Sequence, residues 1–85
     1  MNIQNKQVFS TDNFALAVFL KTESCKCLHI SKNNPRHAIF HFKDTPEREK
    51  LTDEFWQGTA LVEPRAFFGN QKELKTLLYD NSYLG

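Results

Sequence analysis

Residues 25–42, with the sequence CKCLHISKNNPRHAIFHF, are the stretch that decides the fold. Side chains alternate with period two in residues 25–30 and again in residues 37–42, which is typical of half-buried β-strands. Residues 31–36 between them are rich in the turn formers Ser, Asn and Pro, so the stretch predicts an antiparallel β-hairpin. Its core face is predicted to hold Leu28, Ile30, Ala38, Phe40 and Phe42. Its other face is predicted to hold Cys25, Cys27, His29, His37, Ile39, His41 and Lys43.

A helix is predicted before the hairpin and another after it. The first runs through residues 14–20, with Ser10 as its N-cap and a hydrophobic staple between Phe9 and Phe14. In the second helix Thr45 is the predicted N-cap, Pro46 takes the first helical position, and Gly58 ends the helix.

The C-terminal third predicts a third helix. Residues 59–62 are short and apolar and indicate a third strand, and residues 64–68 indicate a helical turn. Asn70 is predicted to cap the last helix together with Glu73, and Phe68 and Leu74 would form its staple.

These elements predict a small α+β fold in the order α-β-β-α-(β)-α, with an antiparallel hairpin packed by helices. The length of 85 residues allows one domain, residues 1–85, with one modest core. Residues 1–8 are expected to fray or to add an edge strand, and residues 81–85 are expected to be loose.

The composition limits the class of protein. Charged residues make up 25% of the chain and eleven residues are aromatic, which is typical of a globular protein. No apolar run reaches the roughly 18 residues of a membrane span, and the N-terminus lacks a secretory pattern. Cys25 and Cys27 are too close together to staple a fold. We therefore expect a cytoplasmic domain that does not contact membranes.

The charge is unevenly distributed. Residues 1–43 contain six basic and two acidic residues, whereas residues 44–85 contain five basic and eight acidic residues. This split suggests an anion or nucleic-acid site on the hairpin, although charged runs are also typical of plain solvated faces. The residues predicted for this site are Lys26, Lys32, Arg36, His37, His41 and Lys43.

A protein interface is the main alternative. Residues 14–20 are all apolar, so this helix is predicted to be buried on every side, in a homodimer or otherwise against a partner. The competing interpretation is that Ala15, Ala17, Lys21 and Thr22 supply an exposed side. The predicted interface residues are Phe14, Val18, Trp56, Phe67 and Phe68.

Metal and thiol chemistry form a third hypothesis. The weak metal candidates are Cys25, Cys27, His29 and His41, whose C-x-C-x-H spacing differs from that of recurrent zinc modules. A cysteine nucleophile lacks a third orienting group and an oxyanion donor in this sequence. We therefore predict no catalytic residue and no cofactor.

Five stretches of the sequence together carry a resemblance to a known family. They are Phe9-Ser10-Thr11-Asp12, Leu16-Ala17-Val18-Phe19-Leu20, Ile39-Phe40-His41-Phe42-Lys43-Asp44, Phe55-Trp56-Gln57-Gly58 and Leu74-Lys75-Thr76-Leu77-Leu78-Tyr79. Through these stretches the chain resembles a family of small bacterial and phage proteins, domain-of-unknown-function family 5659. The resemblance implies a compact α+β domain and a phage or mobile-element setting, and it implies no activity.

The sequence thus favours a non-enzymatic binding module that contacts nucleic acid, or a protein that handles nucleic acid, through the basic hairpin. The alternative is a protein–protein interaction module, either a homodimer or a phage-encoded inhibitor of a host system.

Overall fold

Over the residues that the structure describes, three strands and three helices follow one another in the order β-α-β-β-α-α. The computed structural model describes residues 7–34 and 37–79. The elements are β1 (Val8–Thr11), α1 (Phe14–Thr22), β2 (Cys27–Asn34), β3 (His37–Lys43), α2 (Pro46–Gln57) and α3 (Pro64–Leu78). The predicted α+β class and the predicted hairpin are confirmed, whereas residues 1–6, 80–85, Pro35 and Arg36 lie outside the described part of the chain.

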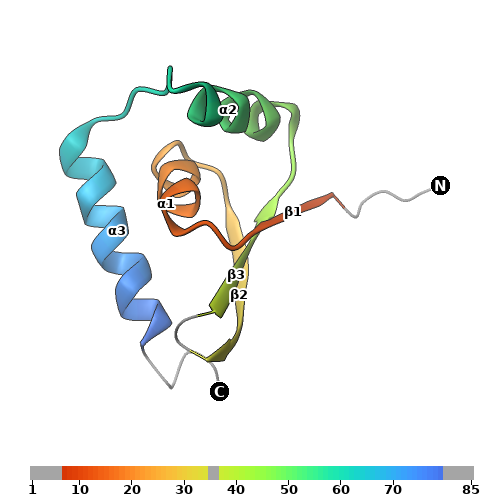
Figure 1. Cartoon of the computed structure of the whole chain (residues 1–85), viewed down its shortest axis with the longest axis vertical. Coiled ribbons are helices and arrows are strands. Elements are labelled where there is room, and N and C mark those ends of the chain that lie inside the picture. The colour runs from red at the N-terminus through yellow and green to blue at the C-terminus, as the bar shows by residue number, and fades with distance from the viewer. Residues whose placement is uncertain (1–6, 35–36, 80–85) are drawn as a thin grey trace.

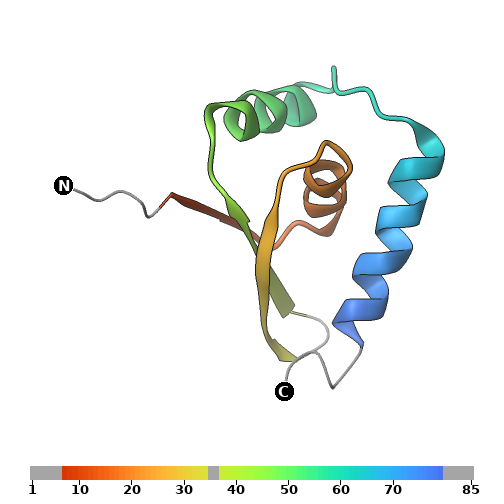
Figure 2. The same ribbon diagram turned by 180° about the vertical axis from the view of Figure 1, so that it is seen from behind.

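The sheet lies on one side of the molecule and the helices lie on the other. Its strand order is β1-β3-β2, and both pairings are antiparallel. In Figures 1 and 2, α1 packs on one side of the sheet, α3 lies beyond α1, and α2 crosses one end of this stack. The opposite side of the sheet, which we call the outer face, carries none of these helices.

Strand β1 was not predicted at its observed place. The prediction that Ser10 caps α1 is wrong, because residues 8–11 pair with β3, with Ser10 opposite His41. The N-cap is Asn13, whose side-chain oxygen accepts a hydrogen bond from the Leu16 backbone N–H at 2.9 Å. Both Ser and Asn are good N-caps, so the pairing of β1 with the open edge of β3 decides where the helix begins.

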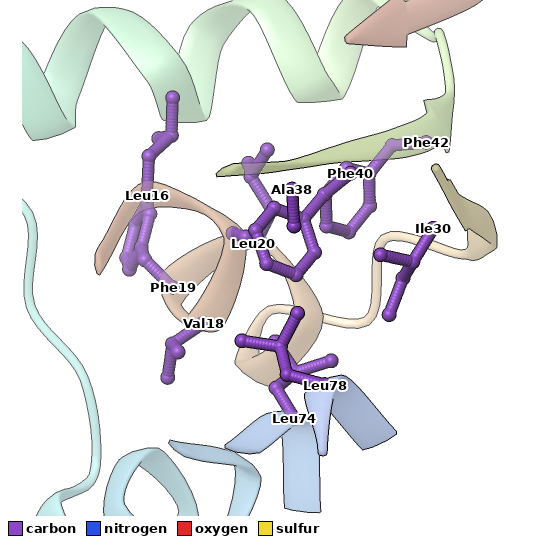
Figure 3. Close-up of a cluster of buried hydrophobic side chains, with 11 residues drawn as sticks. Leu16, Val18, Phe19, Leu20, Ile30, Ala38, Phe40, Phe42, Leu74 and Leu78 are labelled. Carbon is purple, nitrogen blue, oxygen red and sulfur yellow. The ribbon is translucent and has the colours of Figure 1, made fainter. Parts of the chain in front are cut away.

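Helix α1 forms the centre of the core. Five successive residues, 16–20, are buried, and they meet side chains from the sheet and from α3 (Figure 3). The prediction that Val18 lies at an interface is wrong, because Val18 is fully buried within one copy of the chain, and Ala17 is buried too. Ala15 is exposed, which agrees with the competing interpretation, whereas Lys21 and Thr22 are half-buried. The apolar sequence of α1 is thus satisfied within one chain, and it gives no support to a dimer.

A β-bulge in β2 changes which side chains face the core. Cys27 pairs with Phe42, but His29 pairs with the next residue, His41, so β2 contains one extra residue there. An extra residue reverses the in-and-out alternation. Leu28, predicted on the core face, is therefore 43% exposed, and Cys27, predicted on the opposite face, packs against the core.

Helix α2 begins and ends where the sequence predicts. Thr45 is the N-cap, and Gly58 ends the helix with a φ of 78°, a left-handed conformation that glycine adopts without strain. One arginine fastens α2 to the sheet. The Arg48 guanidinium donates to Asp44 at 2.8 Å and lies 3.9 Å from the centre of the Phe9 ring.

Replacing Thr45 by alanine is expected to lower the free energy of unfolding by about 1 kcal/mol. The Thr45 hydroxyl accepts a hydrogen bond from the Arg48 backbone N–H at 3.1 Å, and alanine leaves this N–H without its partner. Urea denaturation measures the change. Thr76→Ala, at an exposed position inside α3, is the matched control and should stay within about 0.5 kcal/mol of the wild type. Equal effects of both changes would contradict the capping role.

Helix α3 is longer than predicted. The expected strand at residues 59–62 is not a strand, and the expected cap at Asn70 is wrong, because one helix runs from Pro64 to Leu78 with Glu63 as its N-cap. An apolar stripe continues past Gly69, from Phe67 to Leu74 and Leu78, and its packing outweighs the roughly 1 kcal/mol that a mid-helix glycine costs. The Asn70 amide instead donates to the Thr22 hydroxyl at 3.2 Å and so ties α3 to α1.

Candidate functional site

The outer face is the surface on which most of the predicted site residues gather. Side chains of alternate residues project from it, and most of them are exposed. The residues that form it are Val8, Ser10, His29, Ser31, His37, Ile39, His41 and Lys43.

His41 is the centre of this face. It lies on the middle strand, and its ring links all three strands, because Nδ1 is 2.8 Å from the Ser10 hydroxyl of β1 and Nε2 is 2.8 Å from the Ser31 hydroxyl of β2. A neutral imidazole has one donor and one acceptor nitrogen, so one serine accepts and the other donates. The two serines therefore fix the plane of the His41 ring.

A second imidazole stacks on the first. The centres of the His29 and His41 rings are 4.3 Å apart and their planes differ by 16°. Burial lowers the pKa of His41, and the neighbouring His29 lowers it further. His41 is therefore neutral at pH 7 and offers a flat ring there, while positive charge on it requires a more acidic solution than for a free histidine.

The three strands contain no acidic residue among the positions that the structure describes. Lys43 is exposed at one end of the outer face, and the exposed Lys26 adjoins it, since the Lys43 backbone N–H donates to the Lys26 carbonyl at 3.0 Å. Helix α2 contains four acidic residues, Glu47, Glu49, Asp53 and Glu54. The basic half of the sequence thus forms the sheet, and many of the acidic residues of the other half lie in α2.

The predicted anion-site residues do not all meet on the outer face. His37, His41 and Lys43 lie there, and Lys26 borders it. Lys32 is placed differently. It pairs with the core-side residue Ala38, and its ammonium lies 5.9 Å from the centre of the Tyr79 ring, toward the end of α3. Arg36 lies outside the described residues.

A hollow of about 410 Å³ lies at the end of the sheet where Lys26 and Lys43 are found. Lys26 and Lys43 line it together with Glu23 and Glu47. Charges of both signs therefore border this end of the sheet, and an anionic ligand has to extend from the two lysines along the acid-free strands.

The two cysteines contribute to the core rather than to the outer face. Both are free and half-buried against core side chains. Burial raises the pKa of both thiols, and at Cys25 the nearby Glu47 carboxylate raises it further. The Cys27 Sγ lies 3.9 Å from the backbone carbonyl oxygen of His29, yet within residues 7–34 and 37–79 no group of three potential metal ligands converges.

Both thiols are expected to react slowly with iodoacetamide. Because their pKa values are raised in the folded chain, the thiolate fraction at pH 8 is smaller than in a free cysteine, and the rate should increase mainly above pH 9. Mass spectrometry of the alkylated chain measures this rate, with the urea-unfolded chain as the reference. Faster alkylation of the folded chain would contradict the assignment of both cysteines to the core.

The remaining predicted interface residues lie on the helices. Phe14 and Phe67 are half-buried against the core. Trp56 is 61% exposed and Phe68 is 63% exposed. Leu61, between α2 and α3, is 88% exposed and was not predicted. We refer to the three exposed side chains of Trp56, Leu61 and Phe68 together as the apolar corner.

The serines that hold His41 were also missed. The sequence pattern alone predicts Ser10 as a helix cap and Ser31 in a loop, because Ser is common in both. The sequence feature that predicts this strand is the alternation in Val8-Phe9-Ser10-Thr11, which places Phe9 on one side and Ser10 on the other.

The arrangement defines a small α+β domain with an exposed, acid-free antiparallel sheet. The sequence matches the family described as Domain of unknown function (DUF5659) over residues 6–80, and the chain belongs to this family. No curated protein and no solved structure matched the chain. No helix in the described part of the chain has the length and apolar character to cross a bilayer.

Proposed function

We propose that this domain is a non-enzymatic binding module that contacts nucleic acid through the outer face. The observation that supports the proposal best is the exposed sheet surface without any acidic side chain in its three strands. The phosphate backbone of nucleic acid provides most of the affinity in such contacts, and an acidic side chain among them would repel it.

The bound nucleic acid is expected to lie in a defined direction on the outer face. Lys26 and Lys43 provide phosphate contacts at one end of the sheet, and His37 lies on the same face toward the other end. The four acidic residues of α2 disfavour a polyanion next to that helix. The charges thus favour binding across the strands of the outer face.

Fluorescence anisotropy with a labelled oligonucleotide tests this function. We expect binding at low salt, with log K falling linearly with the logarithm of the salt concentration between about 50 mM and 200 mM. Absence of binding at about 50 mM salt, or an affinity that does not change with salt, would contradict the proposal.

A second candidate function is association with a protein, and the apolar corner favours it. Its three side chains, Trp56, Leu61 and Phe68, are large and apolar and each more than 60% exposed, and exposed aromatic residues often anchor protein interfaces. The partner is a second copy of the chain or a host protein that the module inhibits. Light scattering at high protein concentration tests the first alternative, and a strict monomer would exclude the homodimer.

We place the domain in the cytoplasm of a bacterial or phage-infected cell. Two free cysteines support this location, because the cytosol keeps thiols reduced. The phage or mobile-element setting stays a prediction.

A further inference from the structure

The ring of His41 is held in a more definite orientation than phosphate binding requires. His41 has both ring nitrogens at 2.8 Å from serine hydroxyls, and His29 lies parallel to it at 4.3 Å. Exposed histidines that contact only phosphates need charge and reach, not a fixed ring plane. The fixed plane therefore indicates a ligand that is itself flat.

The stack leaves ring faces available. Each imidazole uses one face for the other, and His29 is exposed. The hydroxyls of Ser10 and Ser31 occupy the edges of His41, so its ring cannot rotate without losing both hydrogen bonds. A flat group can extend this stack without any rearrangement of the sheet.

The charges around the two histidines indicate which kind of flat ligand they bind. The stack lies in acid-free strands, and Lys43 is exposed two residues after His41 in the same strand and on the same face. A group that is flat and joined to negative charge fits both features. Nucleobases in a single strand have this chemistry, and proteins bind them by stacking on aromatic side chains, histidine included.

We propose that the pair His29 and His41 is a base-stacking platform that selects single-stranded nucleic acid. This inference rests on the proposed function, to which it adds the strandedness of the ligand and the residues that hold a base. In a duplex the bases already stack on one another, so their faces cannot reach the platform. Lys26 and Lys43, which adjoin each other at one end of the sheet, hold the phosphates on one side of the stacked base.

The experiment compares two single-stranded oligonucleotides of equal length and charge, one with bases and one with abasic sites at its centre. Their affinities for the wild type, His29→Ala and His29→Phe are measured by anisotropy at one salt concentration. His29 is exposed, so both variants are expected to keep the fold, and circular dichroism checks this.

The wild type is expected to bind the base-containing strand roughly tenfold more tightly than the abasic strand. His29→Phe keeps an aromatic face and should preserve this preference, whereas His29→Ala should reduce it and keep the wild-type salt dependence. A duplex of the same length should bind as weakly as the abasic strand.

Three results would overturn the platform. They are equal binding of both strands by the wild type, an unchanged preference in His29→Ala, and duplex binding as tight as that of the single strand. If binding is still salt-dependent in these cases, the platform fails and the proposed function stands. If no oligonucleotide binds at low salt, both fail.

Discussion

Replacing Phe42 by alanine is expected to lower the free energy of unfolding by about 3–5 kcal/mol. Phe42 is fully buried, lies on the middle strand, and pairs with Phe9 on one side and Cys27 on the other. Alanine removes the ring and leaves a cavity between the sheet and α1. Because small domains have only about 5–15 kcal/mol of stability, this single change is expected to remove a large share of it.

Urea denaturation followed by circular dichroism measures this loss. Leu61→Ala is the control, because it also removes a large apolar side chain but from a position that is 88% exposed. Its effect should stay within about 0.5 kcal/mol. A loss below about 1 kcal/mol for Phe42→Ala would contradict the placement of the core between the sheet and α1.

The double variant Lys26→Glu with Lys43→Glu is expected to bind nucleic acid on the order of 100-fold more weakly than the wild type at low salt. Both ammonium groups border the acid-free strands, and the two glutamates would join Glu23 and Glu47 around the hollow at that end. The slope of log K against log salt should become shallower by about 2, since each lost lysine removes about one phosphate contact.

The control for this double change is Lys50→Glu with Lys72→Glu. It alters the net charge of the chain by the same amount, but its lysines lie exposed on α2 and α3. Anisotropy should show a small change in affinity and an unchanged salt slope. Equal losses in the two double variants would mean that the net charge, and not the outer face, determines binding.

The sequence was sufficient to predict the elements whose signals are local. Alternation in β3 predicts a half-buried strand, and Thr45, Pro46 and Gly58 mark the ends of α2. These signals are reliable because each depends on backbone geometry within a few residues.

The wrong predictions of helix caps and strand faces share one physical cause. In each case, contacts with residues distant in the sequence determine the local structure. Ser10 has the chemistry of a helix cap, but pairing with β3 makes it part of a strand. Asn70 has the same chemistry, but the stripe of α3 against α1 continues through it. The bulge at Cys27 and Leu28 cannot be inferred from the alternation of side chains, because a strand with one extra residue has the same kinds of residues as a regular strand.

The candidate site was predicted in part. The basic hairpin predicted His37, His41 and Lys43 on one face, and they share the outer face. The stack of His29 on His41 and its serine supports depend on the register of three strands, which the sequence does not specify.

The most direct test of the account is an NMR titration of the labelled chain with a single-stranded oligonucleotide. The account predicts that amide shift changes are concentrated on the outer face, at Ser10, His29, Ser31, His41 and Lys43, while α2 and α3 stay unchanged. Shift changes concentrated at Trp56, Leu61 and Phe68, or spread evenly over the chain, would contradict it.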